Sequence, residues 1–355
     1  MKKKFSFLSF LNRYKAYILV ILMLAVFTPL VMTGVIDRRT PFVNPNLLIQ
    51  IAYTMVAVVS LNLVVGFLGE LSLGHAGFVY VGAYVTGVFM FYGQKLIPNS
   101  FLCFIVAMLL GGLAAMAYGF VVGLPALRLK GDYLAIVTLA SGEIIRGILK
   151  NIPLSKELAS NTKAGFSVIK YATEYADFLV PISFIIVLIT VFCVTNIVNS
   201  KHGRAVTAIK DNEIAARAMG VNITYYKLIV FAIAAFFAGI AGAIFANYTT
   251  ISPSIFDYNR SIEFLVMVVL GGMGSIFGSL VSSIIIVVLD NTLSGLLSGN
   301  LAALKTIIYA LVLILMMLFS SAPAFVRFRE RIFGAFKRKK SKKEAETENK
   351  GGAKE

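Results

Sequence analysis

Long apolar stretches alternate with short polar connections along most of this 355-residue chain. A helix that crosses a bilayer needs about 20 predominantly apolar residues. By that measure the spans are 16–36, 48–67, 72–92, 101–124, 133–149, 178–199, 226–247, 261–273, 276–290 and 302–320. If the stretch from 261 to 290 crosses only once, the count falls from ten to nine. The pattern predicts an all-α polytopic membrane protein with about ten transmembrane helices.

Composition supports this class. Hydrophobic residues make up 58% of the chain and charged residues only 14%, whereas soluble domains carry roughly 25% charge. The net charge of +16 is concentrated in short basic clusters that flank the apolar runs. Such clusters mark cytoplasmic faces and contact with lipid headgroups. Nucleic-acid binding is disfavoured, because the pattern predicts no soluble module that would present the basic residues.

The charge pattern divides the chain into a basic cytoplasmic N-terminus at 1–15, a transmembrane domain at 16–320 and a basic, partly disordered cytoplasmic tail at 321–355. The basic loops at 125–132 and 200–226 also belong on the cytoplasmic side. An even number of spans satisfies all of these placements, which favours ten. The basic residues of the loops expected outside, such as Arg38 and Arg39, oppose this assignment.

Ten spans can be read as two inverted five-helix repeats, each with a glycine-rich third span. In the first repeat the interruption contains Ser72, Gly74, His75 and Gly77. In the second repeat it contains Gly271, Gly272 and Gly274. Paired interrupted segments in corresponding positions are a pointer to the substrate path of transporters built from inverted repeats. The alternative is that these glycines only allow close helix packing.

The connection between the sixth and seventh spans has a pattern of its own. Residues 203–220 are rich in helix formers, contain no proline and end at Gly220, so they predict a short cytoplasmic helix. One stripe consists mainly of alanine, as at Ala205, Ala208 and Ala215. Membrane-surface helices usually carry bulkier apolar residues, so the stripe favours docking to a protein over lying on the headgroups.

Five motifs resemble one family. They are Gly69–Phe78, Leu127–Leu139, Gly142–Arg146, Gly271–Ser275 and the segment Glu213–Gly220. The last is similar to the "EAA…G" coupling loop of ABC importer permeases, and together they resemble LivM-type permeases of branched-chain amino acid importers. The external segment around Asn161 to Gly165 departs from the family pattern, which leaves the substrate open.

The resemblance implies roles for particular residues. Those implied in coupling to an ATPase are Arg204, Asp211, Glu213, Ala215, Ala216 and Gly220. Those implied to line the translocation path are Tyr133 and Thr138, in addition to the residues of the two glycine-rich interruptions. It also implies a second, LivH-like permease subunit, two ATP-binding subunits and an extracytoplasmic amino-acid-binding protein, in a bacterial inner membrane with both termini cytoplasmic.

Candidate chemistry is sparse. The chain has no Gly-x-x-x-x-Gly-Lys-Ser/Thr phosphate loop, so we expect partner subunits to hydrolyse ATP, and no catalytic residue, metal ligand or cofactor is assigned to this chain. The two cysteines, Cys103 and Cys193, lie in apolar runs and predict no disulfide. Glu143 and Arg146 are spaced to form an ion pair on one helix.

Two other functions compete with branched-chain amino acid import. A urea or other small-solute importer of the same family would share all of these features. An ion-coupled secondary transporter would also have inverted repeats and interrupted helices, but it would need no docking helix at 203–220.

Overall fold

The computed structural model describes residues 7–33, 44–126, 129, 131–152, 165–172 and 175–296, together with 307, 308, 310, 311 and 314. The chain separates into two units, 1–292 and 293–355, and each is considered by itself. Within the described ranges the fold is helical, and the β structure is a single bridge between Phe166 and Ile251.

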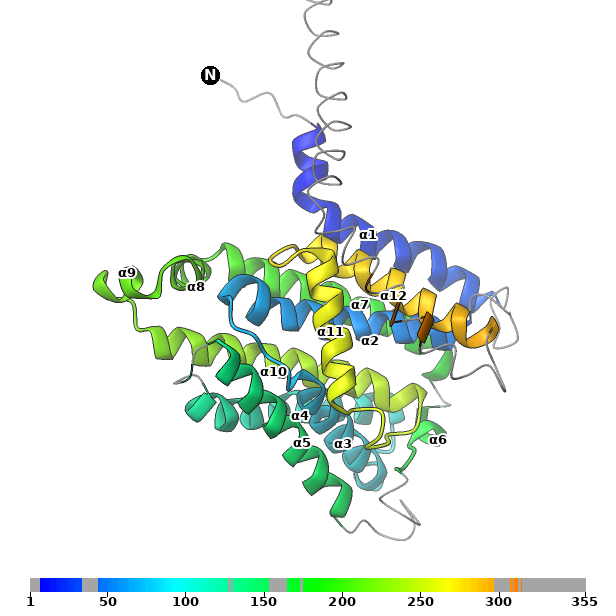
Figure 1. The fold of residues 1–355 in the computed structure, drawn as a ribbon. Coiled ribbons are helices and arrows are strands. Elements are labelled where there is room, and N and C mark those ends of the chain that lie inside the picture. Colours follow the sequence, from blue (N-terminus) through cyan, green and yellow to red (C-terminus); the bar gives the residue numbers. More distant parts are fainter. Residues whose placement is uncertain are drawn as a thin grey trace, which may run out of the picture. The chain divides into compact units, whose positions relative to one another are not determined.

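Figure 1 shows the helices labelled in chain order. They are α1 (Phe7–Met32), α2 (Pro45–Asn62), the π-helix η1 (Leu63–Leu68), α3 (His75–Gly93), α4 (Ser100–Ala126), α5 (Asp132–Asn151), α6 (Ile169–Ala172), α7 (Ala176–Asn199), α8 (Lys201–Asp211), α9 (Glu213–Ala218), α10 (Ile223–Tyr248), α11 (Tyr258–Gly271) and α12 (Ile276–Leu296).

Seven helical segments of the described chain are long and apolar enough to cross a membrane. They are Lys15–Met32, Pro45–Leu68, His75–Gly93, Ser100–Pro125, Phe178–Asn199, Ile223–Tyr248 and Ile276–Gly295. Each coincides with a predicted span. The predicted spans 133–149 and 261–273 are the helices α5 and α11, which do not meet that length and hydropathy criterion. Most of the predicted span 302–320 lies outside the described residues, as does the tail 321–355.

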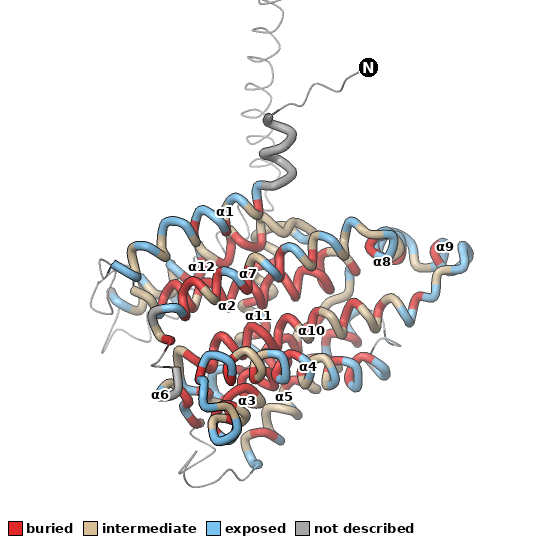
Figure 2. The backbone as a smooth tube through the Cα atoms, turned by 180° about the vertical axis from the view of Figure 1, so that it is seen from behind, coloured by how far each residue is buried: buried red, intermediate tan, exposed pale blue. Residues whose placement is uncertain are grey.

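The helices differ in how much of their surface the protein covers (Figure 2). Of the span that contains α2 and η1, 94% is buried, and of the α10 span 72%, whereas only 17% of the α1 span is buried. A helix that is apolar on every side can be covered by other helices or by lipid. We therefore place α2, α3 and α10 at the centre of the first unit and the exposed apolar sides of α1, α4 and α12 against lipid.

Small residues allow the central helices to approach closely. A Cβ atom added to Gly82 of α3 would lie 2.2 Å from the Gly239 carbonyl oxygen of α10. One added to Gly242 would lie 2.0 Å from the Val79 carbonyl oxygen. In a membrane, where lipid tails are as apolar as leucine, such van der Waals contact is a main source of helix association. These close contacts hold α3 against α10 and thereby position the start of α3.

Candidate functional site at two interrupted helices

The helix that begins as α2 does not end regularly. Its last turn is the π-helix η1, and Gly69, with a φ of 81°, turns the chain into an irregular connection before α3 begins at His75. We call residues 69–74 the first connection. Single π-helical turns often lie at functional sites. Here the Gly66 carbonyl oxygen accepts a hydrogen bond of 2.6 Å from the Lys210 ammonium group of α8.

The second interruption lies between α11 and α12 and meets the first. The turn contains Gly272 and Gly274, with φ values of 90° and 84°. The Gly274 amide donates to the Asn62 Oδ1 atom at 2.9 Å, and the Asn62 Nδ2 atom donates to the Ser279 hydroxyl at 2.9 Å. The buried Asn62 side chain therefore joins the ends of two interrupted helices. In the sequence, Asn62 is distinguished only as an amide side chain within an apolar run.

The first connection packs against α5. The Leu73 amide donates to the Thr138 hydroxyl at 3.1 Å. A Cβ atom on Gly74 would lie 2.0 Å from the Thr138 carbonyl oxygen, and one on Gly77 would lie 2.9 Å from the Gly142 Cα atom. Backbone therefore lies directly against backbone, and any side chain at position 74 would force the two segments apart.

Polar groups are buried where α3 begins. His75 is 1% exposed, and its Nε2 atom lies 2.9 Å from the Ser60 hydroxyl and 3.1 Å from the Ala57 carbonyl oxygen of α2. The Ser72 hydroxyl is buried and has no hydrogen-bond partner within the described part of the chain. Such a group costs free energy unless it finds a partner.

The structure thus divides the predicted path residues into groups. Ser72, Gly74, His75, Gly77 and Thr138 lie together around the start of α3. The second group is Gly271, Gly272 and Gly274. Gly271 packs against Gly278, and the turn that contains the other two meets Asn62 of α2. The Tyr133 side chain is 72% exposed at the start of α5 and belongs to neither buried group.

The predicted helix at 203–220 is divided in two. Asn212 is extended, with φ of −158° and ψ of 103°, and its side chain accepts a hydrogen bond from the Ala215 amide, so α9 starts anew after α8. A capping asparagine competes with continuation of a helix. Figure 1 shows α8 and α9 at one end of the first unit, where they connect the end of α7 to the start of α10.

The six predicted coupling residues differ in exposure. Arg204, Asp211, Ala215 and Gly220 lie at the surface, Glu213 is half-buried, and Ala216 is buried inside the chain. Two large apolar side chains of the segment are strongly exposed: Ile214 is 80% and Met219 is 84% exposed. Met219 belongs to the predicted alanine-rich stripe, whereas Ile214 does not.

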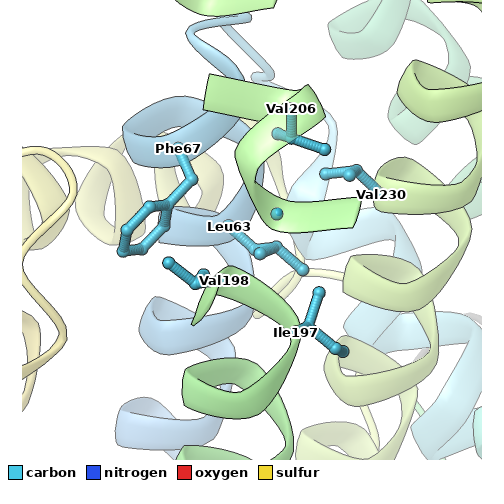
Figure 3. Close-up of a pocket in the computed structure, with 7 residues that line it drawn as sticks. Leu63, Phe67, Ile197, Val198, Val206 and Val230 are labelled. Atoms are coloured by element: carbon cyan, nitrogen blue, oxygen red, sulfur yellow. The ribbon is translucent and has the colours of Figure 1, made fainter. Parts of the chain in front are cut away.

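A small apolar pocket lies where α8 rests on η1 (Figure 3). Its lining side chains include Leu63 and Phe67 of η1, Val206 of α8 and Val230 of α10. The polar contacts of the same region surround it, since Lys210 reaches Gly66 and the buried Lys227 pairs with Glu70. The helix α8 is therefore attached to the interrupted helix by both apolar contacts and a charged hydrogen-bond donor.

Two further ion pairs have the i,i+3 spacing. Glu143 and Arg146 pair on α5, as their spacing predicted, and Arg146 also donates to the Pro253 carbonyl oxygen at 3.4 Å. On α11, Arg260 pairs with Glu263 at 2.6 Å and also contacts the Tyr53 hydroxyl of α2. The sequence pattern did not predict a role for Arg260.

Several apolar spans with two interrupted helices meeting inside them define a multi-pass membrane protein of the transporter class. The sequence then identifies the family. Residues 45–319 match the branched-chain amino acid transport system / permease component family, and the chain belongs to this family.

Two relatives are high-affinity branched-chain amino acid transport system permease proteins LivM. The protein of Salmonella typhimurium is 34% identical over 301 residues, and that of Escherichia coli is 34% identical over 298. In both cases the alignment covers 76% of this chain and 66% of the relative, so the chain spans just under two thirds of their length.

One solved structure was assigned to a metal-chelate type ABC transporter in an inward-facing conformation. It aligns with a TM-score of 0.46 and 15% identity over 85% of this chain and 98% of that chain. A likeness at this level does not by itself define a shared fold.

Proposed function

We propose that this chain is the membrane permease subunit of an ATP-driven importer that carries branched-chain amino acids across a bacterial inner membrane. The observation that carries the proposal is the contact between Asn62 and Gly274, because it joins two interrupted helices and its asparagine is buried in an apolar span. Interrupted helices offer backbone groups to a polar substrate at membrane depth. The substrate class is inferred from the family and from the activity named for the two relatives.

The proposed partners follow from the same reasoning. An extracytoplasmic binding protein would deliver the amino acid, a second homologous permease would complete the path, and two ATP-binding subunits would supply the energy. The exposed side chains of Ile214 and Met219 support docking of α9 to an ATP-binding subunit, because burial in an interface would remove their apolar surface from water.

The contacts of α11 support the ten-span arrangement with two inverted repeats. Near its start Arg260 meets Tyr53 of α2, and the turn after its end meets Asn62, so α11 follows α2 along part of its length. The turn at 272–275 then lies at the same end of α2 as α8, and α12 returns in the opposite direction. We therefore propose that α11 and α12 each cross the membrane, which together with the predicted span 302–320 would give ten spans and two cytoplasmic termini.

A labelling experiment tests this topology. In a background without Cys103 and Cys193, cysteines at Asn44 and Asn300 should react with a membrane-impermeant reagent added outside intact cells. A cysteine at Thr207 should react only after the cells are permeabilised. Protection of the position 300 cysteine in intact cells would favour nine spans and would contradict the inverted repeat.

Uptake measurements test the function. The chain is to be co-expressed with candidate ATP-binding, second-permease and binding-protein subunits, and the complex is to be reconstituted into vesicles. We expect leucine, isoleucine and valine to accumulate only when ATP and the binding protein are present. Accumulation of urea but not leucine would assign the small-solute alternative, and accumulation driven by an ion gradient without ATP would assign a secondary transporter.

A further inference from the structure

The Lys227 side chain connects three separate elements of the chain. Lys227 lies in the second turn of α10 and is 3% exposed. Its ammonium group pairs with Glu70 of the first connection and lies 3.5 Å from the second carboxylate, that of Glu213 at the start of α9. A buried ammonium group is strongly disfavoured without anionic partners. The three elements are therefore held together at one charged centre.

A second lysine holds the same region from α8. The Lys210 ammonium group donates to the Gly66 carbonyl oxygen at 2.6 Å, and a Cβ atom on Gly69 would lie 2.9 Å from the Lys210 Cγ atom. Lys210 thus contacts Gly66 just before the first connection and lies against Gly69 at its start, while Lys227 contacts Glu70, the next residue. The helix α8 therefore reaches the interrupted helix directly through Lys210, whereas α9 reaches it only through Lys227 of α10.

The first connection leads directly to the buried polar groups of the candidate path. Three residues after Glu70, the Leu73 amide donates to Thr138, and the next residue, Gly74, lies against the backbone of α5. A displacement of Glu70 must therefore change either this contact or the ion pair with Lys227. Packed segments of this kind tend to have discrete alternative arrangements rather than continuous deformation.

We propose that Lys227 is a positioning residue that transmits movement of α9 to the first connection through Glu213 and Glu70. This inference rests on the proposed function, because the movement of α9 is ascribed to an attached ATP-binding subunit. The contacts of Lys227 with Glu213 and Glu70 link α9 to the first connection, so that a shift of one is accompanied by a shift of the other.

The test compares transport with ATP hydrolysis in the reconstituted complex. Glu213→Ala removes the contact between α9 and Lys227 and leaves the Lys227–Glu70 pair in place. Lys227→Met removes both contacts while it retains a long side chain. For both variants we expect the ATP-binding subunits to remain attached and to hydrolyse ATP. The amount of leucine transported per ATP should fall about five- to tenfold, within the usual range of coupling between sites.

Arg217→Ala is the matched control, because Arg217 pairs with Glu213 from the exposed side of α9 without contacting Lys227. Its transport per ATP should match that of the unaltered complex. The inference would be overturned if Glu213→Ala lost transport and ATP hydrolysis equally, or if the amount of leucine transported per ATP were unchanged in both test variants. The contacts of Lys227 would then have only a structural role. If the unaltered complex shows no ATP-dependent uptake, the proposed function fails instead.

A double variant separates stability from coupling. Glu70→Lys combined with Lys227→Glu restores an ion pair between the first connection and α10 but brings like charges together toward Glu213. We expect thermal stability close to that of the unaltered complex together with the low transport ratio of Glu213→Ala. Recovery of the ratio along with stability would contradict transmission through Glu213.

Discussion

Gly74→Val is expected to reduce leucine uptake per transporter molecule by about tenfold or more. The added Cβ atom would lie 2.0 Å from the Thr138 carbonyl oxygen, far inside van der Waals contact, so the first connection must separate from α5. Overpacking of this kind costs about 1–3 kcal/mol, and about 1.4 kcal/mol corresponds to a factor of ten. The cost falls on the contact that holds the start of α3.

Gly147→Val is the matched control for this substitution. Gly147 lies on α5, the same helix as Thr138, and a Cβ atom there would meet nothing within 4 Å. Uptake is normalised to transporter abundance in the membrane, and thermal stability is measured in detergent. Normal specific uptake by Gly74→Val, or a loss equal to that of Gly147→Val, would show that close approach at Gly74 has no role in the path.

The second interruption should respond in the same way. Gly274 has a φ of 84°, a conformation that a β-branched residue adopts only with strain, and its amide donates to Asn62. Gly274→Val should therefore lower specific uptake as Gly74→Val does. Asn62→Leu, which removes the acceptor but retains a side chain of similar size, should show the same direction of change.

Ile214→Glu combined with Met219→Glu is expected to abolish attachment of the ATP-binding subunits while membrane insertion stays normal. Burying each of these side chains in an interface would contribute about 1.5–3 kcal/mol, and a buried carboxylate without a partner would oppose binding further. Ala216, which the alanine stripe suggested as a docking residue, is already buried within the chain. Enlarging it would test the fold of α9 rather than the docking surface.

Co-purification of the ATP-binding subunits with the solubilised permease measures this effect. Leu96→Glu is the control, since Leu96 is 82% exposed but lies in the connection between α3 and α4, which the proposed topology places outside. That variant should retain the full complement of ATP-binding subunits. If the variant with both Ile214 and Met219 replaced also retains them, α9 does not dock through these side chains, and a headgroup-facing role becomes the better explanation.

Several features of the site could be read from sequence because they depend on local properties. The glycines of both interruptions, the ion pair between Glu143 and Arg146, and the left-handed glycine at 220 all follow from residue type and spacing. The division at Asn212 of the helix predicted for 203–220 was missed, although an asparagine capping signal was present in the chain. Helix-forming neighbours outweighed that signal in the sequence pattern.

The amino-acid sequence alone was enough to predict a multi-pass helical membrane protein of its family and the positions of seven spans. The length and hydropathy of each apolar run are local quantities that a bilayer selects directly. The contacts between Asn62 and Gly274, 212 residues apart, and between Lys227 and Glu70, 157 residues apart, became visible only in the folded chain. No local pattern encodes such partners, because helices that are apolar on every side can pack in many ways. Close contacts between glycines and the need to satisfy each buried polar group decide among these arrangements.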